Sequence, residues 1–252
     1  MRMKANNLLF LLFLLVFCRC TDDFAGFDKI IPVSGACFPD VSDKYTYPIV
    51  PGMIEWQTAK SMDEVFGFCQ LPDEVLNTIS TPGLIDALIH APLFGLSLIS
   101  SSVGVKGWHH NYEQFNSAKE LFGRKNAGSA LIAYYRYVCL NCCRQNRQSA
   151  LGLEYLFTKD EILNTMRRKE KKEAVWVILS KHKQIYGSEV FPLIYLMYSD
   201  QYKPLMDYAR DHPEWFKNNL EGVFNSPYSG YYGSREEEVE LFVSFAKKYI
   251  ND

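Results

Sequence analysis

Three cysteines within five residues form the densest group of chemically versatile side chains in this sequence: Cys139, Cys142 and Cys143. The first two have the spacing of a zinc knuckle, but a tetrahedral zinc site needs two further ligands. The sequence offers no second Cys-x-x-Cys pair and no His-x-x-x-His pair. In an oxidising compartment we expect one of the three to form a disulfide with Cys37 or Cys69. The alternative is that all five are buried thiols. No metal or other cofactor is expected.

A cysteine nucleophile would need an imidazole beside it to form the reactive thiolate. His109 and His110 follow Trp108 in an expected loop, whereas His90 and His182 fall on apolar helix faces, where histidines are usually structural. Neither a Gly-x-Ser-x-Gly turn nor a His-Glu-x-x-His helix occurs. The acidic pairs lie at expected helix starts, where capping explains them. The sequence therefore leans away from an enzyme, although paired-carboxylate chemistry stays open because such residues meet only in three dimensions.

A Gly- and Tyr-rich segment at residues 226–234 is the strongest candidate for a recognition surface. Tyrosine on a glycine-flexed loop gives a large, rigid contact area suited to protein or sugar. The candidate binding residues are Trp108, Tyr228, Tyr231 and Tyr232. The alternative is that these rings pack onto the domain itself.

The amino terminus is typical of an exported protein. A basic start precedes an unbroken apolar run at residues 8–17, which is too short to span a bilayer. Cys18 and Cys20 follow, and then the acidic residues of 21–23. This order resembles a bacterial lipoprotein signal of the Bacteroidetes surface-export type, which implies lipidation at Cys20, or alternatively at Cys18. Arg19 departs from the small residue usual at that position, so a cleaved signal without lipid is the other interpretation.

Composition is that of a folded protein, with 48% apolar and 22% charged residues. A net charge of −2 gives no long-range attraction to polyanions, so nucleic acid is not an expected partner. The expected partners are a membrane, through the lipid, and an unknown protein or glycan. The expected location is the bacterial outer membrane, with the protein anchored there and facing the surface.

The pattern of punctuation and apolar spacing predicts an all-α array of short helices. We expect a signal peptide at residues 1–20, an extended tether at 21–46, and one helical domain at 47–252 with sub-halves 47–145 and 150–252. Capping boxes are predicted at Ser61 and Thr158, each with Glu three positions later. The charged run at residues 167–172 is expected to break the helical pattern. Residues 45–50 could form a short strand, and 191–198 either a strand or a helix.

One segment recurs: Asp73-Glu74-Val75-Leu76-Asn77-Thr78-Ile79 reappears as Asp160-Glu161-Ile162-Leu163-Asn164-Thr165-Met166. Five of the seven positions are identical. Helix pairs that repeat along a chain would form a HEAT-like solenoid. The match fades outside these seven positions, so two similar amphipathic helices are the alternative.

A family resemblance rests on several short motifs: Pro51-Gly52-x-x-Glu55-Trp56, Cys69-Gln70-Leu71-Pro72, Ser80-Thr81, and Leu121-Phe122-Gly123-Arg124-Lys125-Asn126. They are similar to a family of uncharacterised Bacteroides-type α-helical lipoproteins, over about residues 47–135. The resemblance implies an envelope protein and no known activity or catalytic residue. The sequence departs from the family pattern at residues 94–110, where members often carry a polar run.

Three hypotheses follow. The first is a lipid-anchored, non-enzymatic module that binds an envelope partner. The second is a glycan-binding or glycan-processing accessory protein. The third, a cysteine-dependent enzyme, requires a rapidly alkylating thiol among Cys139, Cys142 and Cys143.

Overall fold

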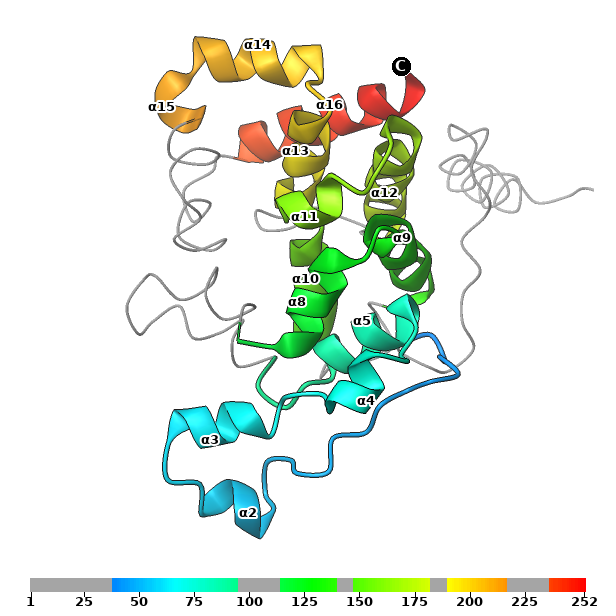
Figure 1. Ribbon diagram of the computed structural model, residues 1–252. Coiled ribbons are helices and arrows are strands. Elements are labelled where there is room, and N and C mark those ends of the chain that lie inside the picture. The colour runs from blue at the N-terminus through cyan, green and yellow to red at the C-terminus, as the bar shows by residue number, and fades with distance from the viewer. Residues whose placement is uncertain (1–37, 95–113, 140–146, 182–189, 217–235) are drawn as a thin grey trace, which may run out of the picture. The chain divides into compact units, whose positions relative to one another are not determined.

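The computed structural model describes residues 38–94, 114–139, 147–181, 190–216 and 236–252 (Figure 1). These residues all belong to the second of two compact units, Ile31–Asp252; the first is Met1–Ile30. The predicted all-α fold is confirmed, because every regular element in the described ranges is a helix. Residues 45–50 form no strand, and residues 191–198 lie within a helix.

The described helices follow one another as a multi-helical array. The short amino-terminal ones are α2 (Ile54–Gln57), α3 (Met62–Gly67) and α4 (Asp73–Leu76). The central ones are α5 (Thr81–Ile89), α8 (Asn116–Gly123), α9 (Ala127–Tyr137), α10 (Arg147–Leu156), α11 (Asp160–Leu163) and α12 (Arg168–Lys181). The last are α13 (Val190–Ser199), α14 (Lys203–Asp211), α15 (Pro213–Phe216) and α16 (Glu236–Asn251).

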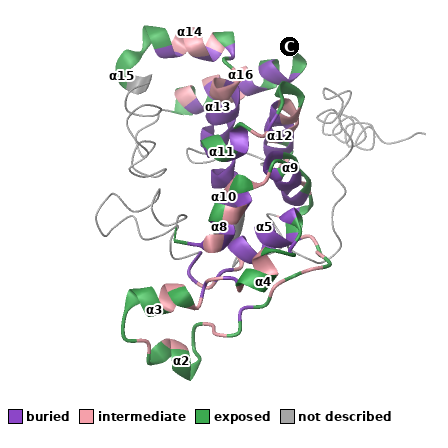
Figure 2. Cartoon of the chain, in the orientation of Figure 1, coloured by how far each residue is buried: buried purple, intermediate pink, exposed green. Residues whose placement is uncertain are grey.

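The longer helices pack in sequence, so that α5 contacts α9, α9 contacts α12, and α12 contacts α16. Helix α8 packs on α5, and α10 and α13 pack on each other. Their shared faces are apolar and fully buried, with Leu84, Leu131 and Phe242 each at 0% exposure. Figure 2 shows buried residues concentrated on these helices, whereas α2 and α3 carry exposed and intermediate residues. Burial of these stripes is the main stabilising contribution to the array.

The repeated heptapeptide has the same local conformation at both of its positions. Each copy forms a four-residue helix, α4 or α11, followed by an Asn in the right-handed helical region. The Asn77 amide donates to Asp73 and Val75, and the Asn164 amide donates to Asp160 and Ile162. A longer helix follows each copy, so the sequence echo encodes a recurring local unit of short helix, turn and long helix.

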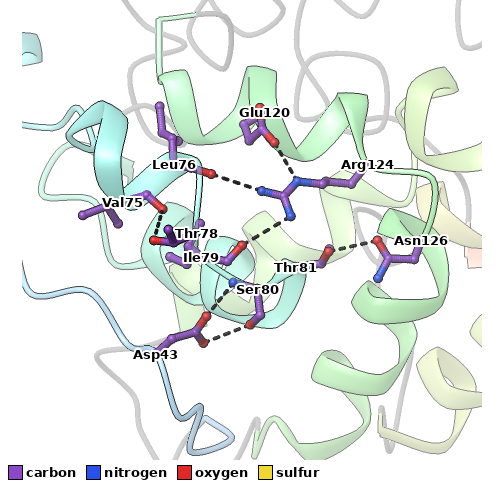
Figure 3. Close-up of polar contacts among 10 residues, drawn as sticks. All are labelled: Asp43, Val75, Leu76, Thr78, Ile79, Ser80, Thr81, Glu120, Arg124 and Asn126. Atoms are coloured by element: carbon purple, nitrogen blue, oxygen red, sulfur yellow. Dashed lines mark hydrogen bonds and ion pairs between the residues drawn. The ribbon is translucent and has the colours of Figure 1, made fainter.

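Side chains far apart in the sequence hold the first of these turns in place (Figure 3). The Arg124 guanidinium donates to the carbonyl oxygens of Leu76 at 3.2 Å and Ile79 at 3.3 Å, and pairs with Glu120 at 2.6 Å. Asp43 accepts from the Ser80 amide at 2.5 Å and from its hydroxyl at 2.9 Å. Ser80 in turn caps α5 by accepting from the Gly83 amide at 3.1 Å.

Part of the predicted tether packs against the helices. The Phe38 ring is buried and lies edge-on to His90, with 5.0 Å between ring centroids. The Tyr47 hydroxyl donates to the Ala87 carbonyl oxygen at 3.1 Å. Together with Asp43, these contacts place residues 38–46 with the helical array. Residues 21–37 lie outside the described ranges.

Of the two predicted capping boxes, one is confirmed. The Ser61 hydroxyl accepts from the Glu64 amide at 3.2 Å, while the Glu64 carboxylate reaches back to the Lys60 amide at 2.7 Å. The box at Thr158 is wrong, because its hydroxyl donates backwards to the Tyr155 carbonyl oxygen at 2.7 Å, at the end of α10. Helix α11 starts one residue later, with Lys159 as its N-cap.

The charged break expected at residues 167–172 is also wrong, because α12 starts at Arg168 and runs through it. Its charges find partners at the end of α13. The Lys171 amine donates to the Ser199 carbonyl oxygen at 3.1 Å, and Arg168 pairs with Asp200 at 3.2 Å. Lysine, arginine and glutamate are also good helix formers, so nothing local opposes the helix.

Candidate functional site

Most residues singled out from the sequence lie outside the described ranges. These are the candidate lipidation sites Cys18 and Cys20, the cysteines Cys37, Cys142 and Cys143, and the aromatic residues Trp108, Tyr228, Tyr231 and Tyr232. The expectations that rest on them stay predictions. Within the described ranges, no group of three or more His, Cys, Asp or Glu side chains could hold a metal ion. No helix in those ranges is both long and apolar enough to cross a membrane.

Two candidate cysteines are described, and they differ in state. Cys69 is a free, fully buried thiol whose sulfur lies 3.5 Å from the Val65 carbonyl oxygen. Burial raises the pKa of Cys69 to about 11, so the thiol is protonated at neutral pH and is a poor nucleophile. Cys139, directly after the C-cap of α9, is disulfide-bonded. Neither provides the reactive thiolate that a cysteine-dependent enzyme needs.

A buried polar network joins α5 to α9. Asp86 is fully buried, and its Oδ1 accepts from the Tyr134 hydroxyl at 2.7 Å. His90 Nδ1 lies 3.3 Å from the same oxygen and 2.8 Å from the Asp86 carbonyl oxygen. Burial alone would raise the pKa of Asp86, but the hydrogen bonds from His90 and Tyr134 outweigh it and lower the pKa. The network links helices through an ionised carboxylate, and only His90 is accessible to solvent.

A second polar cluster fixes the carboxyl end of α9. The Lys181 amine donates to the carbonyl oxygens of Val138 at 2.6 Å and Arg136 at 2.8 Å, and it lies 5.4 Å from the Tyr135 ring centroid. The Tyr135 hydroxyl donates to the buried carboxylate of Glu154. Burial lowers the pKa of Lys181 to about 8; Glu154 opposes the shift and Arg136 adds to it. Because the amine is held by two helix-end carbonyls, its evident role is to cap α9.

The described surface has one feature that packing does not explain. Helices α2 and α3 contain no buried residue, and no residue from 48 to 68 is buried. We call residues 50–68 the arm. It carries three of the four large apolar side chains that are exposed in the described ranges: Met53 at 42%, Ile54 at 73% and Met62 at 60%. Because three of these side chains lie on one short segment, the arm is a candidate interaction site.

The base of the arm is attached to the array by specific contacts. The Phe66 ring packs edge-on against the buried Phe115, with 5.9 Å between centroids. The Gln70 amide donates to the Phe66 carbonyl oxygen at 2.7 Å and accepts from the Asn116 backbone amide at 2.9 Å. Asn116 in turn pairs with both backbone groups of Leu71, at 2.9 Å and 2.7 Å. These contacts hold the carboxyl end of the arm, and the buried Tyr47 precedes its amino end, while its apolar side chains stay exposed.

The stretch of sequence that contains the arm is acidic. Residues 38–76 contain seven carboxylates and two lysines, whereas the whole chain has a net charge of −2. The exposed acidic side chains nearest the apolar ones in sequence are Glu55, Asp63 and Glu64. The arm therefore carries exposed apolar side chains with carboxylates close by in the sequence, which we call its acidic surround.

Sequence reasoning placed a capping box at Ser61, where α3 begins, but missed the arm as a surface. Phe66 and Cys69, after this cap, are where the structure attaches the segment. Met62 comes directly after the capping Ser61, and Met53 and Ile54 begin a single helical turn. The usable signal was that these three apolar residues lie off any inward-facing stripe.

No protein-family model matches this sequence, and neither a curated protein nor a solved structure shows significant similarity to the chain.

Proposed function

We propose that this protein is a lipid-anchored protein of the bacterial cell envelope, and that it acts as a non-enzymatic module binding a protein partner through the arm. The observation that carries the proposal is the exposure of Met53, Ile54 and Met62 on a segment that is anchored at its base. When a partner covers hydrophobic side chains that a fold leaves in solvent, the free energy falls, and this favours binding.

The proposed location has separate support. The apolar run at residues 8–17 and the acidic residues after Cys20 are typical of an exported lipoprotein. Disulfides persist in oxidising compartments such as the bacterial periplasm and cell surface, and Cys139 is disulfide-bonded. Both observations agree with an exported protein.

Intact mass of the protein from the membrane fraction tests the anchor. The expected result is a chain that begins at Cys20 and carries two or three acyl groups. A lipid on Cys18 instead would move the anchor site and keep the proposal. An unmodified chain that begins after the apolar run would overturn the anchor.

Site-specific photocrosslinking in the producing cells tests the binding surface. A photoreactive residue at position 54 is compared with one at position 137, since Tyr137 is the other exposed large apolar residue in the described ranges, at 40%, and lies outside the arm. We expect a protein adduct from position 54 that Met62→Glu abolishes, and none from position 137. Equal adducts at both positions, or none at position 54, would argue against a binding arm.

A further inference from the structure

We propose that the partner of the arm is a protein segment on which Lys and Arg side chains surround apolar ones, as on a basic amphipathic helix. This inference rests on the proposed function and names the chemistry of its partner. Three features of the arm carry it: the exposed apolar side chains, the acidic surround, and the absence, among the described residues, of basic side chains paired with these carboxylates.

Among the residues that the structure describes, the acidic side chains in and beside the arm in sequence are not paired with basic side chains. Within the described ranges, no ion pair joins Glu55, Asp63, Asp73 or Glu74 to a Lys or Arg. Glu64 is held by the Lys60 backbone amide and not by a side chain. By contrast, the described carboxylates of α12 and α14 pair with Arg or Lys, as Glu170 and Asp207 do. The charge on the arm is therefore available to a partner.

Apolar side chains and unpaired carboxylates together select the partner. The exposed Met and Ile side chains need an apolar surface that excludes water, and methionine adapts to varied shapes. The surrounding carboxylates favour Lys and Arg at the rim, which speeds association and penalises acidic partners. A basic amphipathic helix meets both requirements when its apolar face lies on the arm.

The same charges disfavour two other occupants. In a symmetric dimer the same patch meets itself, so two acidic surrounds would face each other and repel. A bilayer surface is commonly anionic, and the helices that lie on it carry Lys and Arg on their polar face. The arm is acidic, so an anionic bilayer would repel it.

Fluorescence anisotropy with a defined probe tests the proposal. The probe is an 18-residue labelled amphipathic peptide of Leu and Lys, and its control has Glu in place of every Lys. Binding of each to the purified full-length protein is measured at low and high salt. The key variants are Ile54→Glu and Met62→Glu, which remove apolar surface and add negative charge. Tyr137→Glu makes the same chemical change away from the arm. Circular dichroism and urea unfolding check that each variant is folded.

The expected result is saturable binding of the Leu/Lys peptide that weakens with salt and is absent for the Leu/Glu peptide. Ile54→Glu and Met62→Glu each weaken binding tenfold or more, whereas Tyr137→Glu changes it less than twofold. If either arm variant binds as tightly as the wild type or tighter, the attraction is charge alone and the proposal is overturned. Equal binding of the Leu/Glu peptide would overturn it as well.

Two further measurements separate the other occupants. Sedimentation equilibrium of the wild type and Ile54→Glu tests for a dimer. Flotation with anionic vesicles compares Ile54→Glu with Tyr137→Glu, because the lipid anchor contributes equally to both variants. If Ile54→Glu alone loses a dimer or vesicle binding, the proposal of a basic amphipathic partner is overturned. If the peptide fails while position 54 still crosslinks to a protein in cells, the partner chemistry is wrong and the proposed function stands.

Discussion

Replacing Tyr134 by Phe deletes one oxygen atom from the core and tests the electrostatics of the α5–α9 contact. The hydroxyl donates at 2.7 Å to Asp86 Oδ1, and Asp86 is 0% exposed. The other carboxylate oxygen, Oδ2, has no hydrogen-bond partner among the described residues, so loss of the phenol leaves His90 as the remaining side-chain donor. Solvent cannot easily replace the missing donor at a buried site.

The expected loss follows from the charge on the acceptor. A hydrogen bond to an ionised group contributes about 1.5–3 kcal/mol, and we expect Tyr134→Phe to lower the free energy of unfolding by about 2–3 kcal/mol at pH 7. For a domain of this size, that corresponds to a fall in Tm of roughly 4–12 °C. Urea unfolding followed by circular dichroism gives the first quantity, and calorimetry gives the second.

A double-mutant cycle isolates the cause. In an Asp86→Asn background the acceptor is neutral, so Tyr134→Phe should cost only about 1 kcal/mol, and the coupling is the difference. Tyr137→Phe is the matched control on the same helix, and we expect it to change stability by less than about 0.5 kcal/mol because the side chain is 40% exposed. If Tyr134→Phe costs less than this control, or the same in both backgrounds, the charge-assisted bond is refuted.

The same pair has a pH signature. The pKa of Asp86 is lowered in the folded state, so the carboxylate contributes stability above its unfolded pKa and loses it as the pH falls through the folded value. Tyr134→Phe removes one cause of the lowering. The difference in stability between wild type and variant should therefore be full near neutral pH and shrink in acid, where Asp86 becomes protonated.

Three other changes have clear expected outcomes. A Cβ on Gly128 would lie 2.7 Å from Thr165 Oγ1 and closer still to Met166. Gly128→Ala should therefore lower the free energy of unfolding in urea by about 1–3 kcal/mol. In the control Gly123→Ala, the added Cβ meets no atom within 4 Å, and we expect no loss of stability. Cys69 should react with iodoacetamide at pH 7.5 at least 100-fold more slowly in the native state than in urea, and fast native labelling would contradict its burial. Because the pKa of Lys181 is lowered to about 8, the folded state releases its proton before the unfolded state does. The stability of the wild type relative to Lys181→Met should therefore rise between pH 8 and pH 10, and a flat or falling difference would refute the shift.

Much of the fold could be read from the sequence because apolar spacing and caps act locally. Leu84, Ile85, Leu88 and Ile89 have the three-four spacing of a helix and fall within α5, and Pro82 lies in its first turn. Ser61 capped α3 as its spacing indicated. These features depend on neighbours within one or two helical turns, so a single sequence contains the information.

The errors came where a distant partner decides the outcome. In the charged run at residues 168–172, Lys171 donates to the Ser199 carbonyl oxygen and Arg168 pairs with Asp200, both at the end of α13. Nothing near residue 168 in the sequence predicts these partners. Thr158 has the spacing of a cap but closes the preceding helix instead. Asp86 lies among apolar residues of α5, and only the fold shows that Tyr134, 48 residues later, donates to it.

The candidate surface could be predicted least of all. An exposed apolar residue looks the same in a sequence as a buried one, and its exposure depends on which helices fail to cover it. Met53, Ile54 and Met62 became notable only when the structure showed them exposed. The lipidation and tyrosine candidates depend on residues outside the described ranges, and they stay predictions.

The absence of buried side chains between residues 48 and 68 also bears on how the sequence can change over time. A substitution in a packed helix such as α9 disturbs its neighbours and usually requires a compensating change, whereas exposed positions usually alter stability by less than about 0.5 kcal/mol. Contacts of Phe66 and Gln70 fix the carboxyl end of the arm. Between the start of α2 and Phe66, side chains can be replaced with little effect on folding. The described part of the chain thus separates a segment that tolerates substitution from a constrained helical scaffold, so the arm can diversify while the array stays the same.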